Sequence, residues 1–186
     1  LPNSWNIEKL KETRCVDDKY SYTGGPFGSD LKSEDYVSEG IRILQLQNIG
    51  DGVFQDDYKI FTTKKKADEL FGCNIYPGEI IIAKMAEPLA RACIIPNDQE
   101  RYLMASDGIR LKVDSNKYCS KYILEYINSM YFRNEAIKKG SGSTRLRIGL
   151  SVLGEIKLSI PSLLEQQKIA NILSTWDKAI ELKEKL

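Results

Sequence analysis

The C-terminal segment constrains the fold of this chain more than any other part of its sequence. Ser162 and Glu165 have the spacing of a capping box, in which each side chain accepts a hydrogen bond from the other residue's backbone. Apolar residues then recur at steps of three and four positions, as in the seam of a coiled coil: Ile169, Ile172, Leu173, Trp176, Ile180 and Leu186. This pattern predicts a long helix over residues 161–186.

The predicted helix has two possible packing partners. A helix that follows a domain commonly folds back on that domain. Here the apolar stripe is narrow, is flanked by charged side chains and continues to the last residue, which favours pairing with a second helix. Because the stripe reaches the final residue and the first residue is not methionine, we also expect the natural protein to be longer.

Residues 1–160 carry shorter patterns, which are typical of a mixed α/β (α+β) globule. Apolar and β-branched runs predict strands at residues 41–49, 53–61, 79–83, 91–95, 108–113 and 156–160. A short helix should be capped by Thr62 or Thr63, and a longer one should run from Cys119 to a stop at Gly140. We therefore predict one globular domain followed by the C-terminal helix.

Composition excludes several classes of enzyme. The chain contains no histidine, which removes Ser-His-Asp and Cys-His catalysis and the commonest zinc ligand. Its cysteines, Cys15, Cys73, Cys93 and Cys119, are widely spaced, so we expect reduced and mostly buried thiols that form neither disulfides nor metal sites. No run of about 18 apolar residues and no signal-peptide pattern occur, so we expect a soluble, cytoplasmic protein without a membrane segment.

The start of the predicted helix resembles a family signature. Residues 160–173 read IPSLLEQQKIANIL, which is similar to the I-P-x-L-x-E-Q-x-x-I-A-x-x-L pattern of the specificity subunits of type I restriction-modification enzymes. Residues 1–5 (LPNSW), 47–49 (QNI) and 78–81 (GEII) resemble further motifs of that family in the same order. The sequence departs from the family at position 4, a serine for the usual glycine, and at residues 84–91 (KMAEPLAR), which lack the glycines of a turn ending in G-R.

The resemblance implies a specificity subunit, or half of one, with a single DNA target recognition domain (1–160) and a single conserved spacer helix (161–186). Such a protein would recognise one half of a split double-stranded DNA target. Its helix would pair with a second specificity half, within one chain or in a homodimer. Modification (methyltransferase) subunits would methylate adenine and a restriction subunit would cleave DNA. S-adenosylmethionine, ATP and magnesium would bind to those partners, and no cofactor to this chain.

A basic segment near the end of the predicted domain suits this role. Residues 131–150 hold five basic residues and one acidic residue. Glycines and hydroxyl groups accompany the cations, a composition suited to phosphate contacts. The predicted contacts are Lys138, Lys139, Ser143, Thr144, Arg145 and Arg147. From the residues alone, an exposed turn with solvated charges is an equally good interpretation.

Planar side chains elsewhere have the chemistry to read base edges. Glutamine and asparagine form paired hydrogen bonds with adenine, and arginine forms them with guanine. The candidates are Gln45, Gln47, Asn48, Arg91 and Arg145, with Lys84 and Ser29 as further DNA contacts. For each residue taken alone, hydrogen bonding within a strand or loop is the simpler interpretation. Residues 23–29 (TGGPFGS) lack the G-K-[ST] ending of a phosphate-binding loop, so we reject nucleotide binding there.

Two other functions stay open at the level of sequence. A small metal-dependent endonuclease would use D/E-x-K triplets, which occur at residues 57–59 (DYK) and 155–157 (EIK). Such triplets arise by chance in a chain with 27 basic and 26 acidic residues. A regulator that does not bind DNA would associate only through the terminal helix and titrate modification subunits. The chain lacks D-P-P-Y or N-P-P-Y methyltransferase motifs, so we expect it to be noncatalytic.

Overall fold

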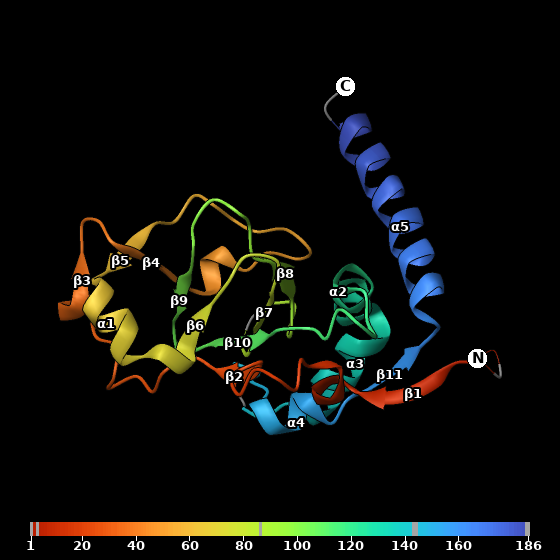
Figure 1. Ribbon diagram of the computed structural model, residues 1–186, viewed down its shortest axis with the longest axis horizontal. Helices are drawn as coiled ribbons and strands as arrows, with labels where there is room; N and C mark the ends of the chain where they lie inside the picture. The colour runs from red at the N-terminus through yellow and green to blue at the C-terminus, as the bar shows by residue number, and fades with distance from the viewer. Residues whose placement is uncertain (1, 3, 86, 143–144, 185–186) are drawn as a thin grey trace.

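The computed structural model describes residues 2, 4–85, 87–142 and 145–184 (Figure 1). Its helices are α1 (Lys64–Glu69), α2 (Ser120–Asn128), α3 (Met130–Lys139), α4 (Leu150–Gly154) and α5 (Leu163–Glu184), and its 3-10 turns are η1 (Leu10–Thr13), η2 (Ser33–Asp35), η3 (Leu46–Asn48) and η4 (Phe71–Cys73). The fold is of the mixed α/β class that the sequence predicts. Within the described ranges, no helix is long and apolar enough to cross a membrane.

The strands of the described residues form three sheets. The first has the order β3 (Tyr36–Val37), β5 (Ile60–Thr62), β4 (Ile41–Leu44), β9 (Tyr102–Met104) and β6 (Asn74–Ile75), with β4 and β9 parallel. The second is antiparallel, with the order β2 (Tyr22–Gly24), β10 (Gly108–Leu111), β7 (Ile80–Ala83) and β8 (Ala92–Ile94). The third pairs β1 (Asn6–Lys9) with β11 (Lys157–Ile160). Figure 1 shows the first sheet with α1 at one end of the molecule, the second in the middle near α4, and β1, β11, α2, α3 and α5 toward the far end.

Strand β7 joins the two larger sheets into one globule. All of its residues are fully buried, because both of its faces are covered. Ile82 belongs to a core that includes Ile123 of α2 and Phe132 of α3. Ile81, on the opposite face, belongs to a second core that includes Tyr102 of β9. The continuous apolar run predicted as a strand is therefore covered on one side by helices and on the other by the five-stranded sheet.

Several predicted elements are confirmed, whereas two predicted strands are mostly turns. The last four predicted strands appear as β7, β8, β10 and β11, and the Thr63 side chain caps α1 by accepting from the Lys66 N–H. The strand predicted at 41–49 ends at Leu44, because the Asn48 side chain accepts from the Gln45 N–H (3.0 Å) and folds the next residues into η3. Of the strand predicted at 53–61, only its end is extended, as the start of β5.

The long helix predicted from Cys119 to Gly140 is two helices. Ser129 has extended backbone angles (φ −66°, ψ 150°), and its side chain accepts from the Phe132 N–H (3.3 Å), which caps α3. The apolar repeat of the sequence runs through this break and so conceals it. Gly140 ends α3, as predicted.

Helix α5 begins as predicted and packs on the globule through its first turns, and further along Ser174, Asp177 and Ile180 line an open cavity with Glu125 of α2. The Ser162 N–H donates to the Glu165 carboxylate (3.1 Å) and the Glu165 N–H donates to the Ser162 hydroxyl (3.4 Å), which completes the capping box. Gln166 and Ala170, in its first turns, are buried against the globule. Figure 1 shows the rest of α5 projecting away from both sheets.

Candidate nucleic-acid interface

Loops from distant parts of the sequence meet around a groove of about 340 Å³. The groove lies where the β2–η2 loop, the η3 turn, the β9–β10 turn and the loop before α4 approach one another. Its lining includes Phe27, Gln45, Gln47, Met85, Asp107 and Arg145. The groove therefore brings together three of the residues predicted to contact base edges.

The η3 turn places both glutamines at the groove. The Gln45 side-chain amide donates to the Tyr36 hydroxyl (3.3 Å), which holds that side chain against β3. Gln47, in the middle of the turn, is exposed. Their paired donors and acceptors are presented by a hydrogen-bonded turn and not by the strand that the sequence predicts.

Four cationic side chains stand at or beside this groove. Lys84 donates to the Ser106 carbonyl (2.9 Å), and Arg147 forms an ion pair with Asp107 (3.0 Å). Arg145 lines the groove and is exposed. The pKa of the Lys84 ammonium is lowered, mainly because burial disfavours its charge. The Asp107 carboxylate opposes this shift, and the Arg147 guanidinium adds to it. A bound anion would favour the charged form of this lysine.

The fourth cation, Arg91, supports the wall of the groove. Its guanidinium donates to the Leu46 carbonyl (2.9 Å) of η3 and to the Glu87 carbonyl (3.1 Å). The preceding Ala90 is fully buried with a φ of 60°, a conformation that favours glycine. Ala90 thus stands in a left-handed conformation directly before Arg91, although the loop contains no glycine.

The prediction that Asn48 reads a base is wrong. Its side chain is fully buried and donates to the Gln55 carbonyl (3.0 Å) and the Tyr58 carbonyl (2.8 Å). It also accepts from the Gln45 N–H, so its amide is committed to the η3 turn. Asn48 acts as a positioning residue for the glutamines and does not reach the surface.

Three further predicted DNA contacts, Ser29, Lys138 and Lys139, are outside the lining of the groove. Ser29 is exposed in the loop that carries Phe27 and donates to Asp30 (3.3 Å). Lys138 pairs with Glu135 (2.8 Å) and Lys139 is exposed, both at the end of α3. After α3, Ser141 forms an antiparallel β-bridge with Arg147, which lies beside the groove. Ser143 and Thr144 lie outside the described residues.

The side chains of the groove that sequence reasoning did not nominate include Phe27 and Met85. Phe27 lies within the TGGPFGS segment, whose composition indicates a turn but not the direction of the phenyl group. It also missed Gln166, which is fully buried at the base of α5. The sequence does carry a signal for this residue, because Gln166 is a polar side chain on the face of the predicted helix that turns toward the globule.

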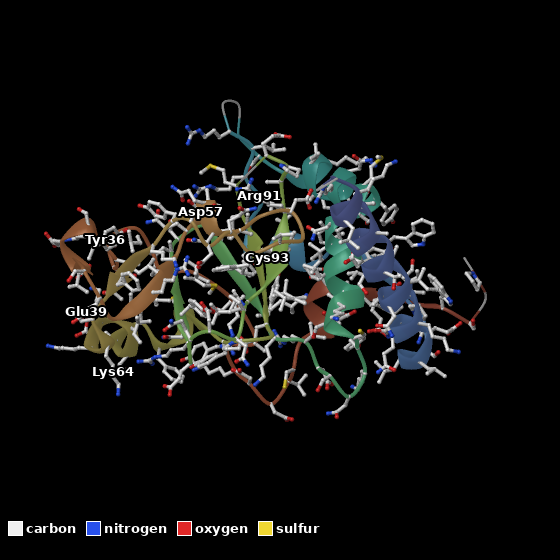
Figure 2. The ribbon with its side chains drawn as sticks, turned by 90° about the horizontal axis from the view of Figure 1, so that it is seen from above. Tyr36, Glu39, Asp57, Lys64, Arg91 and Cys93 are labelled. Atoms are coloured by element: carbon white, nitrogen blue, oxygen red, sulfur yellow. The ribbon has the colours of Figure 1, made fainter. Side chains whose placement is uncertain are left out.

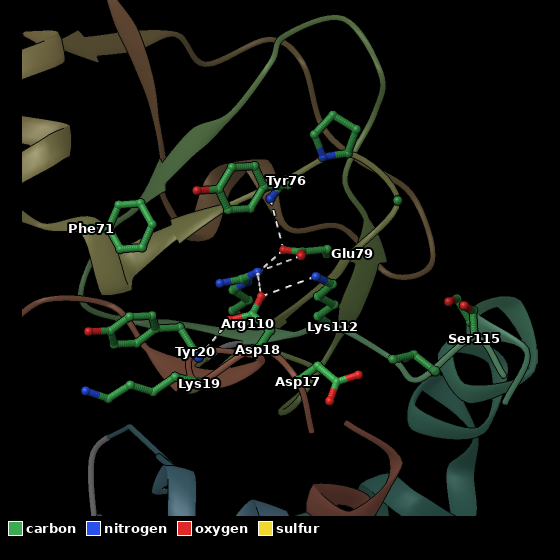
Figure 3. A pocket seen from close by; sticks show the side chains of 14 residues that line it. Asp17, Asp18, Lys19, Tyr20, Phe71, Tyr76, Glu79, Arg110, Lys112 and Ser115 are labelled. Atoms are coloured by element: carbon green, nitrogen blue, oxygen red, sulfur yellow. Dashed lines mark hydrogen bonds and ion pairs between the residues drawn. The ribbon is translucent and has the colours of Figure 1, made fainter. Parts of the chain in front are cut away.

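A larger cavity of about 820 Å³ lies elsewhere, beside Tyr20, Tyr76 and Arg110 (Figure 3). The buried Arg110 guanidinium pairs with both oxygens of Glu79 (2.7 Å each) and with Asp18 (2.7 Å). Lys112 also pairs with Asp18 (3.4 Å), so two cations balance two carboxylates, as Figure 3 shows. The network ties β10 to the turns on either side. We interpret this network as structural.

The carboxylates of the two D/E-x-K triplets do not converge on a metal site. Lys9 (2.7 Å) and Lys11 both pair with Glu155, and their hydrogen bonds lower the pKa of that carboxyl to about 2. Lys59 pairs with Asp56 (2.8 Å). Among the residues that the structure describes, no group of three acidic or cysteine side chains is placed to hold a metal ion.

All four cysteines are unpaired, and the expectation that most are buried is wrong, since Cys93 alone is buried and the other three are half-buried.

The apolar stripe of α5 divides into two parts. Ile169, which we predict as a pairing residue, is half-buried and packs on the core of its own globule. Beyond it, exposure is 59% for Ile172, 39% for Leu173, 66% for Trp176 and 53% for Ile180. These four residues form an exposed apolar face, which we call the α5 seam. Leu186 lies outside the described residues.

The chain belongs to the type I restriction modification DNA specificity domain family, which it matches over residues 12–186. It is 24% identical over its whole length to the type I restriction enzyme MjaVIII specificity subunit and 27% identical to the MjaIX specificity subunit, both from Methanocaldococcus jannaschii. It spans 42% and 40% of those two proteins. Its fold is similar to the crystal structure of the HsdS subunit from Thermoanaerobacter tengcongensis, with a TM-score of 0.70 at 14% identity over 99% of this chain and 45% of that chain.

Proposed function

We propose that the chain is the noncatalytic DNA-recognition half of a type I restriction-modification specificity subunit. Residues 1–160 would be the target recognition domain and residues 161–186 the spacer helix. The observation that carries the proposal is the groove in which Gln45, Gln47 and Arg145, all nominated by their base-reading chemistry, come together. Family membership supports the same function.

The groove offers each kind of contact that sequence-specific DNA binding needs. Gln45 and Gln47 present amides for the N6 and N7 edge of adenine, and Arg145 presents a fork for the O6 and N7 edge of guanine. Lys84 and Arg147, beside them, supply positive charge for phosphates. Lys138 and Lys139 would extend this contact along the DNA backbone.

Partner subunits would supply the chemistry. The α5 seam would pair with the helix of a second specificity half, in the same polypeptide or in a second copy, and so fix the distance between two half-sites. Modification subunits would methylate adenine using S-adenosylmethionine, and a restriction subunit would use ATP and magnesium. Because its proposed substrate is the cell's DNA, we place the protein in the cytoplasm.

Methylation mapping tests this function. The intact natural gene is co-expressed with its neighbouring modification subunit in a host free of DNA methylation, and modified adenines are located by sequencing. A split motif with fixed spacing is expected, and the variant Gln45→Ala/Gln47→Ala should lose or relax positions in one half of it. If an assembled complex modifies no sites, the proposal is wrong and a regulator that titrates modification subunits becomes the better interpretation.

A further inference from the structure

The groove has an apolar side that the glutamines and cations do not account for. Phe27, on the loop after β2, is 84% exposed, the highest value among the large hydrophobic side chains that the structure describes. The lining also includes Pro26 and Gly28 on the same loop and Met85 from the segment after β7. A phenyl group is therefore exposed to water in a groove that also presents amide and charged side chains.

The loop that carries Phe27 is anchored to the groove. The Gly25 N–H donates to the Gly108 carbonyl (2.9 Å), and the Asp30 N–H donates to the Phe27 carbonyl (2.9 Å). A Cβ atom at Gly25 would lie 1.8 Å from the Ala105 carbonyl oxygen, so only glycine allows the loop to lie this close to the β9–β10 turn. This anchoring fixes the backbone of the loop beside the β9–β10 turn, and Phe27 and Gln45 line the same groove.

We propose that Phe27 reads thymine by packing against its C5-methyl group in the major groove. The inference deepens the proposed function and rests on it. An A·T pair presents the amide-binding edge of adenine and the thymine methyl group side by side in the major groove. A surface with glutamine amides next to an exposed phenyl group is complementary to that combination, since the polar groups pair with adenine and the ring covers the methyl group.

Deoxyuridine substitution tests the contact, because it removes only the methyl group. In the mapped half-site, each thymine is replaced in turn, and binding of the assembled complex is measured by fluorescence anisotropy. At one thymine position, the wild-type complex should lose about 3- to 10-fold in affinity, the scale of one buried methyl group with its packing. Phe27→Ala should bind the thymine and uracil forms equally, and Phe27→Leu should keep part of the preference.

The controls separate this contact from DNA recognition as a whole. Val16→Ala removes another exposed apolar side chain, at a site outside the groove lining, and should leave the thymine preference unchanged. If wild type and Phe27→Ala respond equally to every deoxyuridine, the assignment of Phe27 is wrong while the proposed function stands. A 2-aminopurine placed in the site reports unstacking by its fluorescence. If the wild-type complex unstacks it and the Phe27→Ala complex does not, the ring is a wedge between base pairs and the proposal is also overturned. Failure of the wild-type complex to prefer its mapped site would instead contradict the proposed function.

Discussion

Gln166 connects α5 to the globule through one buried side chain. Its carbonyl oxygen accepts from the Cys119 N–H (2.9 Å), and its amide donates to the Pro161 carbonyl (3.0 Å) and the Lys117 carbonyl (3.3 Å). Each of these partners would be left unpaired by an apolar replacement, and a buried unpaired group costs about 1–3 kcal/mol.

Gln166→Leu should therefore lower the free energy of unfolding by about 2–3 kcal/mol. Gln167→Leu, at the exposed neighbouring position, is the matched control and should change it by no more than about 0.5 kcal/mol. Urea denaturation followed by tryptophan fluorescence measures both. Equal stability of the two variants would mean that the hydrogen bonds of Gln166 do not fix the helix.

Arg145 should contribute to DNA binding through its charge. Arg145→Glu is expected to weaken binding and to reduce the slope of log affinity against log salt by about 1, because one fewer counterion is released. Lys64→Glu makes the same change of charge on α1, which Figure 2 shows on the opposite side from Arg91, and should leave the slope unchanged. Titrations at several salt concentrations compare the two. An unchanged slope for Arg145→Glu would remove this residue from the interface.

At the scale of elements, Glu155 joins the end of α4 to the N-terminal strand. Lys11 and Lys9 lower the pKa of its carboxyl from 4.5 to about 2, so the folded state binds the proton less tightly than the unfolded state. The stability that this interaction contributes is present above the unfolded pKa and is lost as pH falls through the folded pKa.

Glu155→Gln should consequently melt at a lower temperature than the wild type at neutral pH. The difference should shrink as pH falls from about 4.5 towards about 2, and it should be smaller at high salt because the pair is solvent-exposed. Thermal unfolding across this pH range measures it. A difference between the two melting temperatures that did not vary with pH would show that the loss comes from something other than the carboxylate charge.

The elements also indicate how far sequence reasoning reaches. Local signals were sufficient where a residue acts on its own backbone, as Ser162 does at α5 and Thr63 at α1. They failed where a polar side chain interrupts an apolar pattern, as Ser129 does between α2 and α3.

Contacts between distant segments were beyond the same reasoning. Arg145 and Gln45 were each nominated from side-chain chemistry, but their meeting at one groove depends on loops that the sheets bring together. Asn48 has the same chemistry as a base-reading residue, and only its burial distinguishes it.

At the scale of the whole molecule, the α5 seam should drive association. Trp176→Asp combined with Ile180→Asp places two charges on exposed apolar positions of the helix and should abolish self-association or pairing with a second half. The globule should stay folded, because neither side chain belongs to its cores.

Gln167→Asp combined with Asn171→Asp is the control, since it adds the same charge at exposed positions away from the seam. Sedimentation velocity reports association, and circular dichroism reports folding. If the seam variant associates as the control does, the pairing surface lies elsewhere on the molecule.

The Gln166 anchor also has a geometric consequence for the reading of DNA. The 22 residues of α5 make it roughly 33 Å long. A change of about 10° in its direction at the anchor would displace its far end by about 6 Å, nearly two steps of about 3.4 Å along the DNA axis. If α5 is the spacer that we propose, the buried contacts of Gln166, together with those of Ile169 and Ala170, would therefore influence how many base pairs separate the two recognition sites.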